Sequence, residues 1–119
     1  MSFSDKRAVS SRIRFLLLTF DVPCKSKSEQ RAYRRFRRSL IQFGYIQLQE
    51  SVYLSLIRDY TSVKKEVKRL KETAPKGSDV KLIAFSQKTS QQVITISGND
   101  WPFEALSREI VVITDDKIA

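Results

Sequence analysis

The strongest constraint on the fold is a continuous apolar run near the start of the chain. Residues 13–20 read IRFLLLTF, and only Arg14 and Thr19 in this run are polar. Such an unbroken run is typical of a strand that is covered on both faces and therefore lies in the centre of a sheet. Pro23 cannot donate to a strand ladder, so the strand is predicted to end near Asp21.

Two amphipathic helices are predicted after this strand. The first begins at a capping box, in which Ser26 is followed three residues later by Glu29, and it ends at Gly44. Its apolar stripe recurs at steps of three and four residues and consists of Tyr33, Phe36, Leu40 and Phe43. The second helix is predicted for about residues 61–74, where one face carries Val63, Val67, Leu70 and Ala74.

Alternating polarity predicts two short strands between the helices. Residues 45–57 alternate, and Glu50 interrupts the pattern, so we predict a tight turn near Gln49 and Glu50. Further strands are predicted over residues 80–85, 92–96 and 109–114. The order strand, helix, strand, strand, helix, strand is that of a ferredoxin-like βαββαβ sandwich. This is an α+β fold in which both helices cover one face of an antiparallel sheet.

The length of 119 residues predicts a single domain. We expect residues 1–12 to form a flexible N-terminal arm, residues 13–97 the ferredoxin-like domain, and residues 98–119 a C-terminal extension with a strand near 108–114. The sheet face without helices would be bare in one subunit, so a twofold homodimer is expected. Tyr53 falls on the polar side of its strand, and we expect it to pack in the dimer rather than stack on a base.

The composition excludes several classes of site and favours an anionic partner. The chain has no histidine and one cysteine, Cys24, which excludes an intrachain disulfide, a Cys/His zinc site and a Ser-His-Asp nucleophile. A lone cysteine fits a reducing compartment, and a cytoplasmic location without membrane attachment is expected. Lys and Arg number 22 against 13 Asp and Glu, a net charge of +9, which favours a phosphate backbone.

The first predicted helix carries an uninterrupted group of arginines. Four of them fall within about a third of the helix circumference, opposite the apolar stripe: Arg31, Arg34, Arg35 and Arg38. Arg37 lies nearer the flank of that arc, and no acid occurs between Glu29 and Glu50. A solvated helix face is the alternative, but like charges at this spacing destabilise a free helix. Because the planar guanidinium suits phosphate, we predict that these arginines bind nucleic acid.

Two other features of the sequence carry weaker signals. The second helix carries Lys64, Lys65, Lys68, Arg69 and Lys71, but Glu66 and Glu72 are interleaved with them, so a solvated, ion-paired face is expected there. Asp21 is held rigidly at the end of the first strand, either as a turn-capping residue or as a metal ligand. One carboxylate alone is a poor Mg²⁺ site, but a twofold axis could bring two copies of Asp21 together.

Taken together, these segments resemble the CRISPR-associated protein 2 family over roughly residues 13–97. The resemblance is carried by residues 20–23 (FDVP), residues 33–40 (YRRFRRSL), Gly44 and residues 49–53 (QESVY), in that order and spacing. The long arginine-rich helix is most similar to the versions that accompany single-effector systems. Phe20 departs from the family pattern, in which an aromatic hydroxyl often precedes the aspartate.

This resemblance implies a role in spacer acquisition. It implies a homodimer that bridges the CRISPR integrase, CRISPR-associated protein 1, and supports a DNA duplex, while the integrase performs strand transfer. The family is also described as Mg²⁺-dependent endonucleases, which would make Asp21 a metal ligand and catalytic residue acting on RNA or DNA. A purely structural ferredoxin-like dimer is the third alternative.

The end of the chain contains a β-branched run without an obvious partner strand. We expect this segment to add to a sheet edge of the second subunit or of the integrase, as extended peptides commonly do. The residues assigned to this contact are Arg108, Ile110, Val111, Val112 and Ile113.

Overall fold

The computed structural model describes residues 13–57 and 62–102 of the chain. Its first six elements follow in the predicted order, and a short helix comes after them. They are β1 (Arg14–Asp21), α2 (Lys27–Gln42), β2 (Ile46–Gln49), β3 (Val52–Ile57), α3 (Ser62–Thr73), β4 (Asp79–Ser86) and α4 (Gln87–Ser90). The expected arm over residues 1–12 and the expected strand near 108–114 lie outside the described residues.

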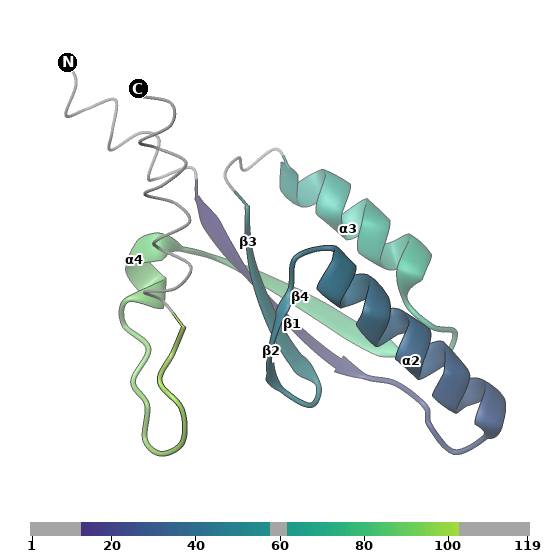
Figure 1. Cartoon of the computed structure of the whole chain (residues 1–119). Coiled ribbons are helices and arrows are strands. Elements are labelled where there is room, and N and C mark those ends of the chain that lie inside the picture. The colour runs from purple at the N-terminus through teal and green to yellow at the C-terminus, as the bar shows by residue number, and fades with distance from the viewer. Residues whose placement is uncertain (1–12, 58–61, 103–119) are drawn as a thin grey trace.

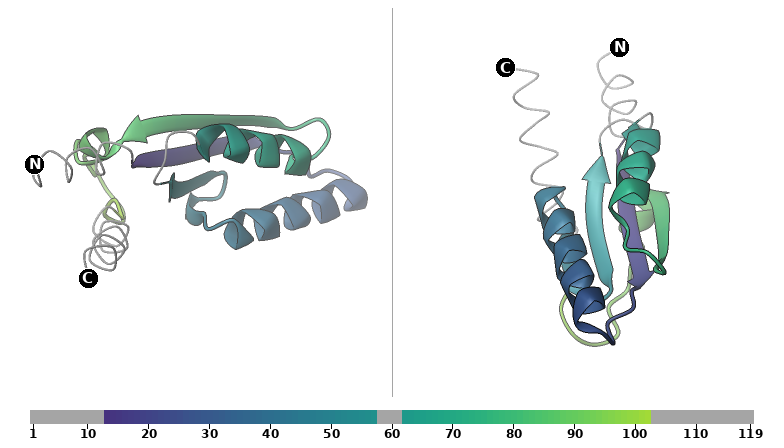
Figure 2. Two further views of the ribbon diagram at one scale, coloured as in Figure 1. Left: turned by 90° about the horizontal axis from the view of Figure 1, so that it is seen from above. Right: turned by 90° about the vertical axis from the view of Figure 1, so that its right-hand side faces the viewer.

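The four strands form one antiparallel sheet in the order β2-β3-β1-β4. β1 is central, as its apolar sequence predicted: Leu17 lies opposite Leu54 on β3 and opposite Ile83 on β4. Helices α2 and α3 both lie on one face of this sheet (Figures 1 and 2). This arrangement confirms the ferredoxin-like α+β sandwich, and it leaves β2 and β4 as edge strands among the described elements.

The boundaries of α2 are set by the residues that predicted them. The Ser26 hydroxyl accepts a hydrogen bond from the Glu29 backbone N–H at 3.1 Å, and the Glu29 carboxylate accepts one from the Ser26 backbone N–H at 2.9 Å. These two bonds satisfy amide groups that the first helical turn leaves without partners. Gly44 follows the helix with φ +93°, a left-handed conformation that glycine adopts without steric cost.

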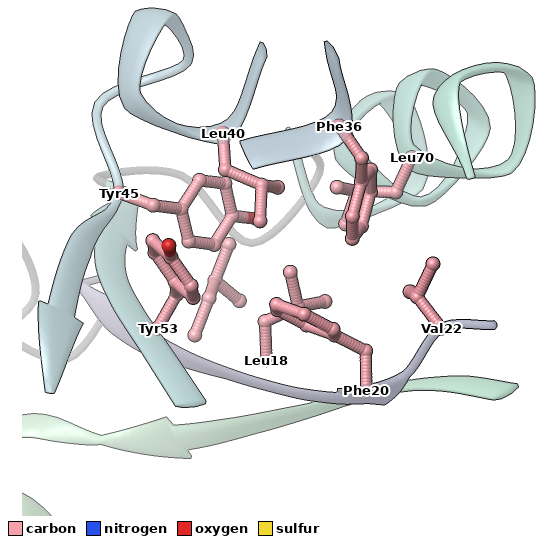
Figure 3. Packing of buried hydrophobic residues seen from close by; sticks show 9 residues of the cluster. Leu18, Phe20, Val22, Phe36, Leu40, Tyr45, Tyr53 and Leu70 are labelled. Carbon is pink, nitrogen blue, oxygen red and sulfur yellow. The ribbon is translucent and has the colours of Figure 1, made fainter. Parts of the chain in front are cut away.

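The main core fills the space between the helices and the sheet (Figure 3). Even-numbered residues of β1, among them Leu18 and Phe20, meet Phe36 of α2 and Leu70 of α3. The rings of Phe20 and Phe36 pack edge to face with centroids 5.1 Å apart, a geometry that aromatic pairs prefer. This packing fixes the rotation of α2, so that its polar residues face outward.

Tyr53 belongs to this core, and its predicted place in a dimer contact was wrong. Its side chain is fully buried, and it lies opposite Leu18 across the β1–β3 ladder, beneath the helices (Figure 3). The alternation of β3 was identified correctly, but both faces of this strand bury apolar side chains. Gln47 and Ser51 fall on the same side of the alternating pattern as Tyr53, so this helix-covered side looked polar in the sequence.

The face opposite the helices carries a second apolar cluster. Phe15 and Leu54 are fully buried there, and the partly buried residues around them are Leu17, Leu48, Leu56, Phe85 and Trp101. The Trp101 indole N–H donates to the Ser90 hydroxyl at 2.7 Å, which ties residues 91–101 to α4. Ile83 of β4 is 50% exposed on this same face. The second face is therefore apolar and only partly covered.

The strand predicted for residues 92–96 is absent from the described chain, and that prediction was wrong. Instead, Ser86 caps the short helix α4 by accepting the Thr89 backbone N–H at 3.2 Å. The chain then continues without a strand ladder through residues 92–96, where Ile94 and Ile96 are 80% and 92% exposed. The alternation of β-branched residues suited a strand, but no described strand pairs with it.

A partly buried polar network joins α3 to the segment between α2 and β2. The Tyr45 hydroxyl donates to Glu66 at 3.0 Å, and Arg69 donates to the other oxygen of Glu66 at 2.6 Å. Arg69 also lies over the Phe43 ring, 3.8 Å from its centroid. Burial, together with the neighbouring Glu66 carboxylate, raises the pKa of Tyr45 well above its ordinary value near 10.

Replacing Tyr45 with Phe should therefore change the stability of the protein at alkaline pH. Because the folded-state pKa is raised, the stabilisation by the neutral phenol is fully present below about pH 10 and decreases above it. In the wild type, this one group should lower the free energy of unfolding by about 1.4 kcal/mol per pH unit above pH 10. Urea unfolding at pH 8 and pH 11 should show that the free energy of unfolding falls less for Y45F than for the wild type between these two pH values. An equal loss would contradict this account.

Candidate nucleic-acid interface and metal site

Helix α2 presents four arginines on its outer side. Phe36 and Leu40 are buried against the sheet, so the opposite side of the helix is turned to solvent. The residues exposed there are Arg31, Arg34, Arg35 and Arg38, as the sequence predicted. In the described part of the chain, none of these four has a carboxylate within 4 Å. Their charge is therefore not neutralised by the described residues of the protomer itself.

Arg37 lies in a different environment from the other four. Its Nε donates to the Tyr53 hydroxyl at 3.1 Å, its Nη2 approaches the Gln47 side-chain oxygen at 3.5 Å, and its guanidinium lies 5.8 Å from the centre of the Tyr33 ring. The hydrogen bond that Arg37 donates to the Tyr53 hydroxyl raises the pKa of Arg37 above its usual value. Arg37 thus links α2 to strands β2 and β3, a contact that sequence alone did not reveal.

Asp21 ends β1 on the opposite side of the sheet from the arginines. Its neighbours Phe20 and Val22 both pack in the core beneath the helices. Since successive side chains of a strand point to opposite faces, the exposed Asp21 side chain is directed to the second face. The candidate metal ligand and the arginine group therefore do not form one site within a protomer.

Asp79, which no sequence pattern indicated, lies directly opposite Asp21 in the β1–β4 ladder. Directly paired residues in antiparallel strands have Cβ atoms about 5 Å apart, so the chain brings two carboxylates close together. Lys81, two residues along β4, contacts the Asp79 carboxylate. The signal for this pair would have been the register of β1 and β4, which the sequence did not determine.

The carboxylate pair meets the lower limit of what Mg²⁺ requires. Mg²⁺ is commonly held by one or two carboxylates, with waters and substrate phosphates completing its coordination. Among the described residues there is no group of three or more Asp, Glu, His or Cys side chains that could hold a metal by themselves. Asp21 and Asp79 could thus contribute ligands, but most of the coordination shell would come from water and phosphate.

Comparison with known proteins identifies the family. The family described as CRISPR associated protein Cas2 matches residues 14–93, which includes β1 to β4, the whole of the arginine-bearing helix and Asp21. The chain belongs to the Cas2 family. Its assignment from the residues of β1, α2 and β3 is therefore confirmed.

Two relatives illustrate the degree of similarity to curated Cas2 proteins. The chain is 35% identical over 83 residues to a CRISPR-associated endoribonuclease Cas2 of Campylobacter jejuni, a match that covers 70% of this chain and 58% of the relative. It is 34% identical over 83 residues to the protein of the same name from Streptococcus mutans, covering 70% of this chain and 78% of the relative. The chain thus spans less than two thirds of the Campylobacter protein.

A solved structure supports the same fold. The crystal structure of Streptococcus pyogenes Cas2 at pH 6.5 aligns with a TM-score of 0.54 and 16% sequence identity. The alignment covers 70% of this chain and 99% of the Streptococcus protein. The ferredoxin-like architecture is thus shared with a Cas2 of low sequence similarity.

Two further expectations concern the partner contact near the end of the chain and membrane attachment. The residues assigned to a partner contact, Arg108 and residues 110–113, lie outside the described ranges. Among residues 13–57 and 62–102, no helix combines the length and the apolar character needed to cross a bilayer.

Proposed function

We propose that this Cas2 family member is a spacer-acquisition subunit whose homodimer binds the phosphate backbone of duplex DNA and bridges copies of the CRISPR integrase. The observation that carries the proposal is the row of four exposed arginines on α2, none with a carboxylate partner among the described residues. Guanidinium groups bind phosphate oxygens in a bidentate manner, and phosphate contacts supply most sequence-independent affinity for DNA.

The apolar second face supports the homodimer. A small domain has a marginal core, and burying a further apolar face against a second copy would stabilise it. A groove of about 570 Å³ lies between this face and residues 93–102, and its lining includes the apolar side chains Leu17, Leu48 and Trp101 beside several polar ones. With the second faces in contact, both α2 helices would remain on the outside of the dimer.

The dependence of duplex binding on salt tests this proposal. Each phosphate contact lowers the slope of log affinity against log salt by about 0.9, so four arginines of one protomer predict a slope of about −3.6 or steeper. The measurement is fluorescence anisotropy of a labelled duplex between about 50 and 300 mM NaCl. Binding that is absent, or that does not change with salt, would contradict the proposal.

A Mg²⁺-dependent endonuclease is the alternative function, and two observations favour it. The curated relatives carry the name endoribonuclease, and Asp21 lies opposite a second carboxylate, Asp79. When bound, Mg²⁺ would supply charge neutralisation at a scissile phosphate. The residues of this chain would hold and orient it at the end of β1. RNA is then a second candidate substrate beside DNA.

Replacing Asp21 with Asn should reduce Mg²⁺-dependent cleavage of RNA or DNA to background if this alternative holds. The change removes one of the two anionic ligands while keeping the size of the side chain. Because α2 is unchanged, duplex affinity in the presence of EDTA should stay within about twofold of wild type. Equal cleavage by D21N and wild type would show that the cleavage activity does not come from the Asp21 site.

The C-terminal run at residues 110–113 is proposed to add to the sheet edge of a partner, either the second subunit or the integrase. β4 has a free edge among the described strands, which is the kind of surface that accepts an added strand. Deleting residues 107–119 should weaken assembly with the integrase while duplex binding persists. Unchanged assembly would refute this contact.

A further inference from the structure

Helix α3 looks electrically balanced in the sequence but is not balanced on the folded surface. Glu66 and Glu72 alternate with its basic residues, which suggested local ion pairing. In the structure Glu66 is 8% exposed and turned inward, where it accepts hydrogen bonds from Tyr45 and Arg69. One of the two acids is therefore removed from the outer face.

The Arg69 side chain stays 43% exposed, but its charge is paired with that of Glu66. Its guanidinium pairs with Glu66 and covers the Phe43 ring at the end of α2. These two charges cancel each other within the fold. Apart from this pair, the exposed charged residues of α3 are one acid, Glu72, and the lysines Lys64, Lys65, Lys68 and Lys71.

The remaining lysines point to the same side of the molecule as the α2 arginines. At 100° per residue, Lys64, Lys65 and Lys68 lie roughly opposite the buried Leu70. Both helices cover the same face of the sheet, so their outer sides form one surface of the molecule (Figures 1 and 2). In the described chain none of these lysines has a carboxylate within 4 Å. Positive charge thus extends from α2 onto α3.

We propose that α3 is a second phosphate-contacting surface, so that a bound duplex lies across both helices rather than along α2 alone. The inference rests on the proposed duplex binding and specifies which further residues of the chain take part in it. Lys64 and Lys68, one helical turn apart, act as mobile point charges, whereas the α2 arginines offer planar, directional donors. The α3 contacts therefore add salt-dependent affinity without sequence preference.

The test compares two double substitutions that remove the same charge. K64Q/K68Q changes the outer side of α3, whereas K76Q/K88Q changes exposed lysines in the α3–β4 turn and on α4. Duplex affinity is measured by fluorescence anisotropy across a salt series, with circular dichroism to verify folding. We expect K64Q/K68Q to reduce the salt slope by about two and to weaken binding about 30-fold near 0.15 M salt, with K76Q/K88Q close to wild type.

A gain of affinity provides a readout that misfolding cannot imitate. E72Q removes the one exposed acid of α3 and should tighten duplex binding about threefold at low salt. If K64Q/K68Q binds like K76Q/K88Q and E72Q binds like wild type, α3 is only a solvated face and the inference is wrong. The proposed function is judged separately, by charge reversal on α2, which does not involve α3.

Discussion

Reversing two charges on α2, in the variant R34E/R38E, should abolish measurable duplex binding at moderate salt. Arg34 and Arg38 lie one turn apart on the outer side of the helix, and neither has a carboxylate partner in the described chain. Losing two phosphate contacts alone weakens binding about 30-fold near 0.15 M salt, and two new repulsions should raise the loss above about 100-fold. Glu is a good helix former, so the helix itself should persist.

Two controls separate local contact from net charge and from charge type. K76E/K88E reverses the same number of charges outside α2 and α3 and should weaken binding only slightly, through the overall field. R34K/R38K keeps both charges but loses the planar fork, so the salt slope should persist while affinity falls. If R34E/R38E and K76E/K88E lose equal affinity, binding reflects net charge and not the α2 surface.

Placing a charge on the second face, in the variant I83E, should convert the proposed homodimer into a monomer. Ile83 is 50% exposed in the protomer and lies opposite Leu17 in the centre of the sheet. An ionised carboxylate without a partner in an apolar interface costs several kcal/mol, and the twofold axis would introduce two of them. The mass measured by light scattering should fall from twice the chain mass to 13.8 kDa.

The matched control for I83E is an exposed isoleucine on the opposite side of the molecule. Ile41 of α2 is 60% exposed in the helix layer, so I41E should leave the mass of the dimer unchanged. An I83E variant that remains dimeric would show that the second face is not the interface.

The order of elements was predictable because each carries a local signal. The continuous apolar run fixed β1 as the central strand, and the capping box with Gly44 fixed α2 to within a residue. These signals depend on neighbouring residues and on the spacing of apolar residues, and both can be read from the sequence itself. The outward direction of the α2 arginines followed from the same period.

The features that could not be predicted depend on contacts between distant segments. Tyr53 looked peripheral because the sequence does not show that α2 covers its side of β3. Glu66 looked like a surface acid because its partner Tyr45 lies 21 residues away. The pairing of Asp21 with Asp79 depends on strand register, and no local pattern encodes it. Each of these contacts changes which polar or charged side chains are available to a ligand on the surface.

The most direct measurement of the central claim is chemical footprinting of arginines with phenylglyoxal, with and without a saturating DNA duplex. Modification of each arginine is followed by peptide mass spectrometry. If the outer side of α2 holds the phosphate backbone, then Arg31, Arg34, Arg35 and Arg38 should react several-fold more slowly in the complex. Equal reactivity of these four arginines in free and DNA-saturated protein would contradict the account.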